Sequence, residues 1–180
     1  MKKDRERKRQ ELLQRIRGFR LMDDEFMTKC FEDNVECTEL VLRIVMDKDD
    51  LKVKSARTQY TVKNLQGRSV RLDVFADDSM NRKYNIEIQK SEKGAGSKRA
   101  RYNSSLMDAN AILPGDDAEL LPENYVIFIT ENDLFGIGLP VYHIDRMVKE
   151  TGMKRMGGRR NSGKKRGSSV RIISYGDNRL

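Results

Sequence analysis

The sequence predicts a single α/β domain, and three features of the chain support this prediction. Two stretches that alternate apolar and polar residues, RLDVFADD (71–78) and KYNIEIQK (83–90), have the period of β-strands and flank a polar turn. A third, YVIFIT (125–130), is a continuous apolar run, typical of a central strand that is buried on both faces. Segments predicted as helices precede the paired strands and separate them from the third strand.

Length and composition limit the classes of protein to which the chain can belong. Its 180 residues suit one domain, and 37% hydrophobic against 36% charged residues predicts a modest core beneath a heavily charged surface. No apolar run approaches a membrane span, and the basic start lacks the apolar stretch of a secretory signal. Because Cys30, Cys37 and His143 are its only cysteines and histidine, zinc binding is not expected, and a cytoplasmic, bacterial-type location with reduced thiols is favoured.

Charge is unevenly distributed along the chain. Of the net charge of +8, residues 1–20 carry +6 and residues 151–180 carry +8, so the middle of the chain carries −6. Basic ends can contact DNA phosphates, but a run of charges is also what a solvated tail shows. Both interpretations stay open, and the candidate contacts in the C-terminal tail are Lys164, Lys165 and Arg166.

The first third of the chain is expected to contain a basic arm or helix (residues 1–21), two further helices and a strand. Acidic residues at 23–24 favour the start of a helix there. Thr38 is expected to cap the next helix. The buried stripe of that helix is expected to comprise Leu40, Val41, Ile44 and Val45. Rough alternation over residues 51–62 predicts the first strand.

The segments on either side of the central strand are a helix and an edge strand. A Gly-containing loop (91–98) leads into a helix that ends before Pro114. After the central strand, GIGLPVYHI (136–144) predicts a further strand, and Pro140 argues for a position at the edge of the sheet. A short helix, IDRMVKE, is expected to follow.

The chain changes in character after Thr151. Residues 151–169 are rich in Gly, Ser, Lys and Arg and have little to bury, which predicts a disordered linker. Residues 170–180 include VRIISY, which offers a final strand. The folded domain is therefore expected at residues 22–150.

The paired strands carry acidic residues that suggest a functional site. If the strands form an antiparallel hairpin, Asp73 and Glu87 converge on one face of the sheet, with Gln89 beside them. Two neighbouring carboxylates repel each other unless a cation lies between them, and hard divalent cations such as Mg²⁺ prefer oxygen ligands of this kind. The alternative is that these are ordinary exposed residues, because the wet face of an amphipathic hairpin shows the same alternation.

Four blocks of the sequence resemble the PD-(D/E)XK nuclease superfamily. Asp73, a turn and then Glu87-x-Gln89 on the next strand look like the catalytic motif of that superfamily, in a variant that ends in glutamine instead of lysine. Together the blocks are similar to the branch of recombination-promoting nucleases and transposases, over roughly residues 22–150. They are DDEFMTKCFEDN, NLQGRSVRLDVFADD, YNIEIQKSEKGAGSKRARYNSSLMDA and LPENYVIFITENDLFGIGLPVYHIDR.

The resemblance implies a restriction-endonuclease-like fold, with helices flanking a central mixed β-sheet, and metal-dependent hydrolysis of DNA. Asp73 and Glu87 would bind Mg²⁺ or Mn²⁺ with the backbone carbonyl of Ile88, and Gln89 would orient the attacking water. Glu39, on the helix before the first strand, is a further candidate ligand. The residues expected to contact DNA beside the cleavage site are Arg99, Arg101 and Tyr102.

Two departures from the family pattern leave alternatives open. Gln89 stands where the usual motif has lysine, and the chain after residue 151 is a basic linker where the family continues with a turn, a strand and more helix. A catalytically inactive DNA-binding relative is therefore the main alternative to an endonuclease. An adaptor whose acidic body binds a basic protein is a second alternative. The oligomeric state is open, with a homodimer as one option.

Overall fold

The computed structural model describes residues 7, 9–10, 24–64, 66–90, 96–145 and 169–174. The predicted N-terminal arm, the short helix expected after residue 144 and the predicted linker lie almost entirely outside these residues. Cys30 and Cys37 are free thiols. Within the described segments, no helix has the length and apolar character needed to cross a membrane.

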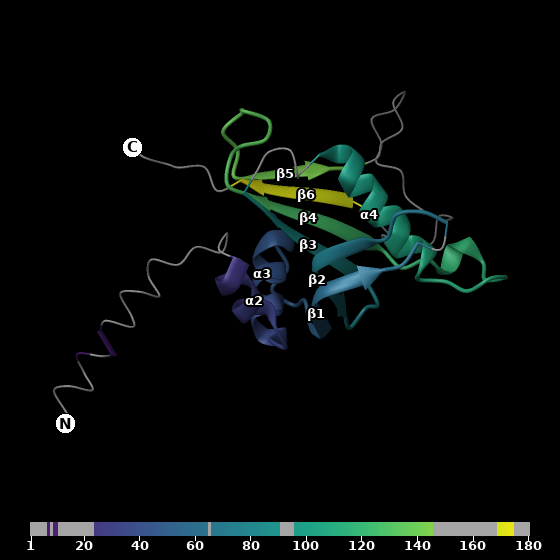
Figure 1. Ribbon diagram of the computed structural model, residues 1–180, viewed down its shortest axis with the longest axis horizontal. Coiled ribbons are helices and arrows are strands. Elements are labelled where there is room, and N and C mark those ends of the chain that lie inside the picture. The colour runs from purple at the N-terminus through teal and green to yellow at the C-terminus, as the bar shows by residue number, and fades with distance from the viewer. Residues whose placement is uncertain are drawn as a thin grey trace.

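Among the described residues, a six-stranded mixed β-sheet forms the centre of the fold (Figure 1). Its strands are β1 (Val53–Val62), β2 (Val70–Asp78), β3 (Lys83–Gln89), β4 (Asn124–Thr130), β5 (Val141–Ile144) and β6 (Ser169–Ser174). They lie in the order β1-β2-β3-β4-β6-β5. β1, β2 and β3 pair antiparallel, β4 pairs parallel with both β3 and β6, and β5 pairs antiparallel with β6 at the edge. The predicted mixed sheet is thereby confirmed.

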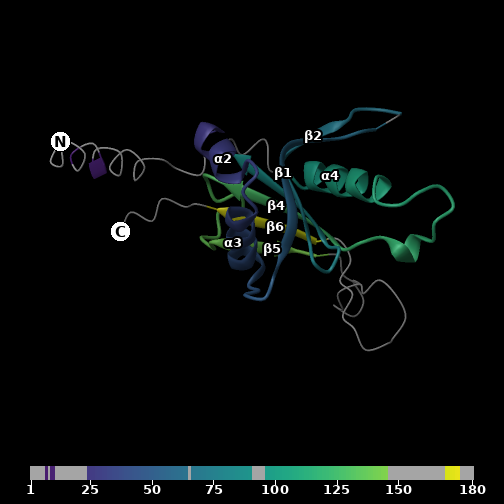
Figure 2. The same ribbon diagram turned by 90° about the horizontal axis from the view of Figure 1, so that it is seen from below.

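Helices cover both faces of this sheet (Figure 2). The helices are α2 (Asp24–Phe31), α3 (Val35–Met46), α4 (Ser97–Ala109) and the short 3₁₀ helix η2 (Ala118–Leu120). α2 and α3 pack on one face through an apolar cluster that includes Phe31 and Leu42, which we call the α2–α3 cluster. α4 packs on the other face through a cluster that includes Leu106 and Met107, which we call the α4 cluster. The α/β fold with flanking helices agrees with the prediction.

The central strands β3 and β4 divide their side chains between the two clusters. Ile86 and Ile127 belong to the α2–α3 cluster, whereas Phe128 belongs to the α4 cluster. Every residue of β4 is buried, as predicted for a central strand. Since Glu87 pairs with Phe128 in the register of β3 and β4, its side chain points to the face that α4 covers.

The phase of α3 differs from the prediction. The helix begins at Val35 because Asn34 caps it, accepting a backbone hydrogen bond of 3.0 Å within the first turn. Thr38, the expected cap, is a buried residue inside the helix. Leu40 and Ile44, expected in the buried stripe, are 58% and 71% exposed. Val45 is buried and Val41 packs against the α2–α3 cluster, both as expected. The buried face, made of Thr38, Leu42, Val45 and Met46, therefore overlaps the expected stripe only in part.

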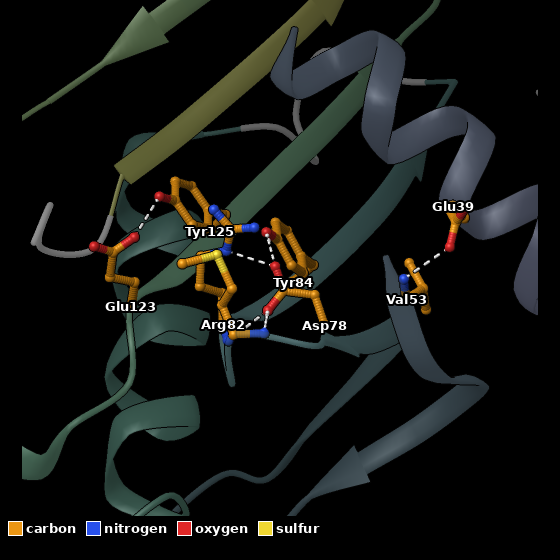
Figure 3. A network of polar contacts seen from close by, with 8 residues as sticks. Glu39, Val53, Asp78, Arg82, Tyr84, Glu123 and Tyr125 are labelled. Carbon is orange, nitrogen blue, oxygen red and sulfur yellow. Dashed lines mark hydrogen bonds and ion pairs between the residues drawn. The ribbon is translucent and has the colours of Figure 1, made fainter. Parts of the chain in front are cut away.

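A buried ionic network fixes the turn between β2 and β3 (Figure 3). Asp78 is fully buried, and its carboxylate accepts two backbone N–H groups of the turn, each at 2.9 Å. Arg82 Nε lies 2.5 Å from Asp78 Oδ2, to which the Tyr84 hydroxyl also donates, at 2.9 Å. Because a slip of one residue would break these contacts, the network sets the register that places Asp73 across from Glu87.

We expect the substitution Asp78→Asn to lower the free energy of unfolding by about 2 kcal/mol. The buried Arg82 would lose its counter-ion, and the Tyr84 hydroxyl would lose a charged acceptor. Urea denaturation at pH 7 measures the loss. Glu119→Gln, an equal change of charge at an exposed position, is the control. Equal stabilities of the two variants would contradict the role given to Asp78.

Candidate active site

Asp73 and Glu87 meet where β2 separates from β3. The paired register of these strands ends at Val74–Ile86, and the two acidic residues come next. The Ile88 N–H donates to Asp73 Oδ2 at 2.9 Å, and the Asp73 N–H donates to the Glu87 carboxylate. The structure therefore brings together the two carboxylates that the sequence suggests as a pair.

The neighbouring strand β1 is distorted beside this pair. Gln59 lies across from Asp73, and its φ of 53° falls in the left-handed region that residues other than glycine rarely adopt. In a regular strand Ala56 and Tyr60 would share one face of the sheet. Here Ala56 packs against the α2–α3 cluster and Tyr60 against the α4 cluster, so β1 changes face between them. Such strain persists only where the surroundings hold it, and it is concentrated at functional sites.

Glu87 is fully buried beneath the first two turns of α4. Arg99 donates to its Oε2 as an ion pair, and Asn103 Nδ2 lies 3.4 Å from its Oε1. Burial, and then the charge of Asp73, raise the pKa of Glu87 to about 7, although Arg99, the Asn85 amide and the Asp73 N–H act in the opposite direction. Arg99 is a cation that favours the ionised form of this buried carboxylate, but it does not offset the full effect of burial and of the Asp73 charge.

Gln89 and Ile88 lie beside the pair, at the end of β3. Gln89 is half-buried, and by the alternation of the strand it shares the face of Glu87. Its backbone carbonyl accepts from the Glu131 N–H at 3.3 Å, which ties the end of β3 to the end of β4. The Ile88 side chain packs on the opposite face, against the α2–α3 cluster. The backbone of Ile88 and Gln89 therefore lies at the site, and the apolar Ile88 side chain anchors this backbone to the opposite face of the sheet.

The stretch that contains this site matches a known protein family. A model of the PD-(D/E)XK nuclease family transposases matches residues 37–154. The chain belongs to this family. Among curated proteins and among solved structures, nothing matches the chain. The assignment supports a nuclease-like or transposase-like function with DNA as substrate, and PD-(D/E)XK nucleases generally use divalent metal ions.

The donor atoms of this candidate site fit a hard divalent cation. Asp73 and Glu87 supply carboxylate oxygens. Across the described residues, no group of three His, Cys, Asp or Glu side chains could hold a metal, so other oxygen donors must complete the coordination. Asn85 is fully buried two residues before Glu87, and its side-chain oxygen and nitrogen have no hydrogen-bond partner. An unpartnered amide near these carboxylates suits a site in which a hydrated cation completes the polar contacts.

Glu39, the further candidate ligand, does not join this site. It lies on α3, on the opposite face of the sheet, and its carboxylate accepts the Val53 N–H at 3.0 Å (Figure 3). It also forms ion pairs with Arg43 at 2.5 Å and Lys52 at 3.4 Å. The hydrogen bond from Val53 lowers the pKa of Glu39. Because its oxygens join α3 to β1, we leave Glu39 out of the metal site.

The candidate DNA contacts on α4 lie in different environments. The Arg99 side chain is 40% exposed and is held by the buried carboxylate beneath it, whereas Arg101 is exposed. Tyr102 donates its hydroxyl to the Arg68 carbonyl and accepts from Asn64 Nδ2 at 3.2 Å. It therefore ties α4 to the turn between β1 and β2. The candidates in the tail, Lys164, Lys165 and Arg166, lie outside the described residues.

Two residues of the site were missed by reasoning from sequence. Asn85 and Asn103 are both buried beside Glu87. The alternation of the strand places Asn85 on the face of Glu87, and i,i+4 spacing places Asn103 on the face of Arg99. These local signals were available, but the packing of α4 over β3 is a long-range contact that neither of them specifies.

Proposed function

We propose that the protein is a divalent-metal-dependent DNA endonuclease that hydrolyses phosphodiester bonds. The observation that carries this proposal is the pair of Asp73 and Glu87 at the point where two strands diverge. The Asp73 N–H donates to Glu87, and the Asp73 carboxylate accepts from the Ile88 N–H. Ordinary exposed carboxylates on a hairpin would not include one that is fully buried against an arginine. Membership of a family of nuclease-type transposases supports the same reading.

The proposed roles follow from where each residue lies. Asp73 and Glu87 would hold Mg²⁺ or Mn²⁺, with the Ile88 carbonyl as a further ligand. A bound divalent cation lowers the pKa of its coordinated water and neutralises charge on the scissile phosphate. Gln89 would orient the attacking water from the face that it shares with Glu87. Its amide is neutral, so positive charge near the phosphate has to come from other residues.

The first turns of α4 are suited to supply that charge. Lys98, Arg99 and Arg101 lie there, and the first turn has no acidic residue. Cations at a helix N-terminus are unfavourable for the helix, because the N-terminus already carries a partial positive charge. The same arrangement favours an anion such as a DNA phosphate. The proposed DNA contacts are Arg99 and Arg101, with Tyr102, Lys164, Lys165 and Arg166 retained from the sequence.

Cleavage of a supercoiled plasmid tests the proposal. With millimolar Mg²⁺ or Mn²⁺ the protein should produce nicked and then linear DNA, and EDTA should prevent both. A closed circle has no ends, so these products identify an endonuclease and exclude an enzyme that degrades DNA from its ends. Asp73→Asn removes a proposed ligand without removing side-chain volume and should abolish cleavage. Equal cleavage by the parent and this variant would point to a contaminating nuclease and reject the proposed site.

A catalytically inactive DNA-binding relative is the second candidate. It is favoured by the neutral Gln89 in place of lysine and by Arg99, which already neutralises Glu87. Such a protein would bind the plasmid with an affinity that falls as salt increases, and it would not cleave in any divalent cation. Absence of both binding and cleavage at low salt would reject both candidates in favour of the adaptor.

A further inference from the structure

Asn85 is a buried polar residue that has no role in the proposed mechanism. It lies in the middle of β3, two residues before Glu87, and is fully buried. Both its side-chain nitrogen and its oxygen lack a hydrogen-bond partner, and in the part of the chain that the structure describes no other buried side chain is left in this state. Because buried polar groups are nearly always partnered, such an exception calls for an explanation.

The position of Asn85 relates it to Glu87. Both side chains point to the face that α4 covers, since Asn85 pairs with Val126 of the α4 cluster. The amide is near enough to favour the ionised form of Glu87, but it is not in hydrogen-bonding geometry with it. The Glu87 oxygens are instead directed to Arg99 and Asn103.

We propose that Asn85 is a positioning residue of the metal site, whose amide donates to the Glu87 carboxylate when a divalent cation, in place of Arg99, neutralises that carboxylate. The inference rests on the proposed function. A carboxylate has about four lone-pair sites, so Glu87 can bind a cation on one side and accept the amide on another. Hydrogen bonds to metal-binding side chains fix their orientation and strengthen metal binding.

The unpartnered state of Asn85 then has a physical consequence. A leucine has the same branched shape as asparagine but no polar atoms that need partners. In the metal-free protein the unpaired amide therefore lowers the free energy of unfolding. A hydrogen bond from the amide nitrogen to Glu87 on cation binding would remove the part of this destabilisation that comes from the unpaired N–H group. The amide therefore favours the cation-bound arrangement over the Arg99-bound one, because a ligand shifts an equilibrium by its differential contacts with the two states.

Asn85→Leu tests the proposal, and the chain offers a matched control in Asn124. Asn124 is also buried, on the adjacent strand β4, but it accepts from Ser104 Oγ at 2.8 Å and donates to Asp108 Oδ1 at 2.5 Å. Calorimetric titration with Mn²⁺ gives the metal affinity, and urea denaturation in EDTA gives the stability of the metal-free protein. Neither readout requires DNA cleavage.

We expect opposite results for the two substitutions. Asn85→Leu should keep or raise the urea midpoint in EDTA and should bind Mn²⁺ ~10- to 100-fold more weakly than the parent. Asn124→Leu should lower the urea midpoint and, if it stays folded, should bind Mn²⁺ as the parent does. Asn85→Ala removes the amide without adding bulk, so its Mn²⁺ affinity decides the question if the leucine does not fit.

The outcomes separate this inference from the proposed function. If Asn85→Leu and Asn85→Ala bind Mn²⁺ as tightly as the parent while Asp73→Asn does not bind it, the role of Asn85 is wrong and the metal site stands. If the parent itself binds no Mn²⁺, both are overturned. A lower urea midpoint for Asn85→Leu with unchanged Mn²⁺ affinity would show that Asn85 is a structural residue only.

Discussion

In metal-free buffer, Glu87→Gln should be more stable than the parent protein at pH 8, although the two should have similar stability at pH 4.5. Burial and the charge of Asp73 raise the pKa of Glu87 from 4.5 to about 7 in the folded protein. Between pH 4.5 and pH 7 the folded protein therefore binds more protons than the unfolded chain. Its free energy of unfolding therefore falls as the pH rises through this interval, and the loss is complete above pH 7.

The expected difference is about 3 kcal/mol, because each unit of pKa shift corresponds to ~1.4 kcal/mol. Glutamine resembles the protonated acid in shape and carries no charge, so the variant lacks this pH-dependent loss. The charged groups that face Glu87 are Asp73 from β2 and Arg99 from α4. Titrating groups distant from Glu87 are common to both proteins and cancel in the comparison. Urea denaturation in EDTA, at several pH values from 4.5 to 8, measures the difference.

Mn²⁺ provides a control in the same experiment. At pH 8 it should restore stability to the parent protein by binding the folded state, and it should have little effect on Glu87→Gln, which has lost a charged ligand. If the parent and the variant instead have parallel stability profiles in EDTA, Glu87 ionises near its ordinary pKa. That result would remove the electrostatic reason for placing a cation between Glu87 and Asp73.

The sheet could be predicted from the sequence more fully than α3 could. A strand has only two faces, so the alternation at Ile86 and Glu87 was enough to place the two side chains on opposite faces of the sheet. A helix can rotate about its axis, and its phase depends on where it starts and on what it packs against. The packing of α3 on the sheet leaves the apolar Leu40 and Ile44 exposed and buries Thr38, and the sequence of the helix alone does not specify this packing.

The candidate site was predictable only in its local part. Asp73 and Glu87 could be predicted as neighbours because a hairpin fixes the register of its two strands. The burial of Glu87 could not be predicted, since its carboxylate is covered by Arg99 and Asn103, which belong to α4, a later segment of the chain. The left-handed backbone at Gln59 has no local signal either, because turn-forming residues do not surround it.

The ion pair of Arg99 and Glu87 links the resting protein to the proposed activity. It favours the ionised form of a buried carboxylate in the absence of metal, with the same side chain that we propose as a DNA contact. A divalent cation at Glu87 would make this pairing unnecessary and leave Arg99 available to a phosphate. Metal binding and DNA binding should therefore favour each other, which is a reciprocal coupling between two ligands.

Replacing Gln89 should separate an active endonuclease from an inactive relative. Gln89→Ala should reduce plasmid cleavage by ~100-fold, the effect typical of removing a group that is aimed at the reacting atoms. Gln89→Lys should keep or raise the cleavage rate, because lysine restores the more usual motif and places a positive charge beside the phosphate. Rates should be measured at saturating Mg²⁺, since a lysine near the cation also weakens metal binding. Neither change should unfold the protein, because the Gln89 side chain is half-buried at a strand end.

The controls for Gln89 have to account for the added charge, which alone strengthens DNA binding. Gln66→Lys adds the same charge in the exposed turn between β1 and β2, away from the carboxylates, and should change DNA affinity without changing the cleavage rate at saturating DNA. If Gln89→Lys changes the cleavage rate no more than Gln66→Lys does, the effect of the lysine at position 89 is general electrostatic attraction to DNA. If Gln89→Ala cleaves as fast as the parent, Gln89 does not orient the water, even where Asp73 and Glu87 prove essential.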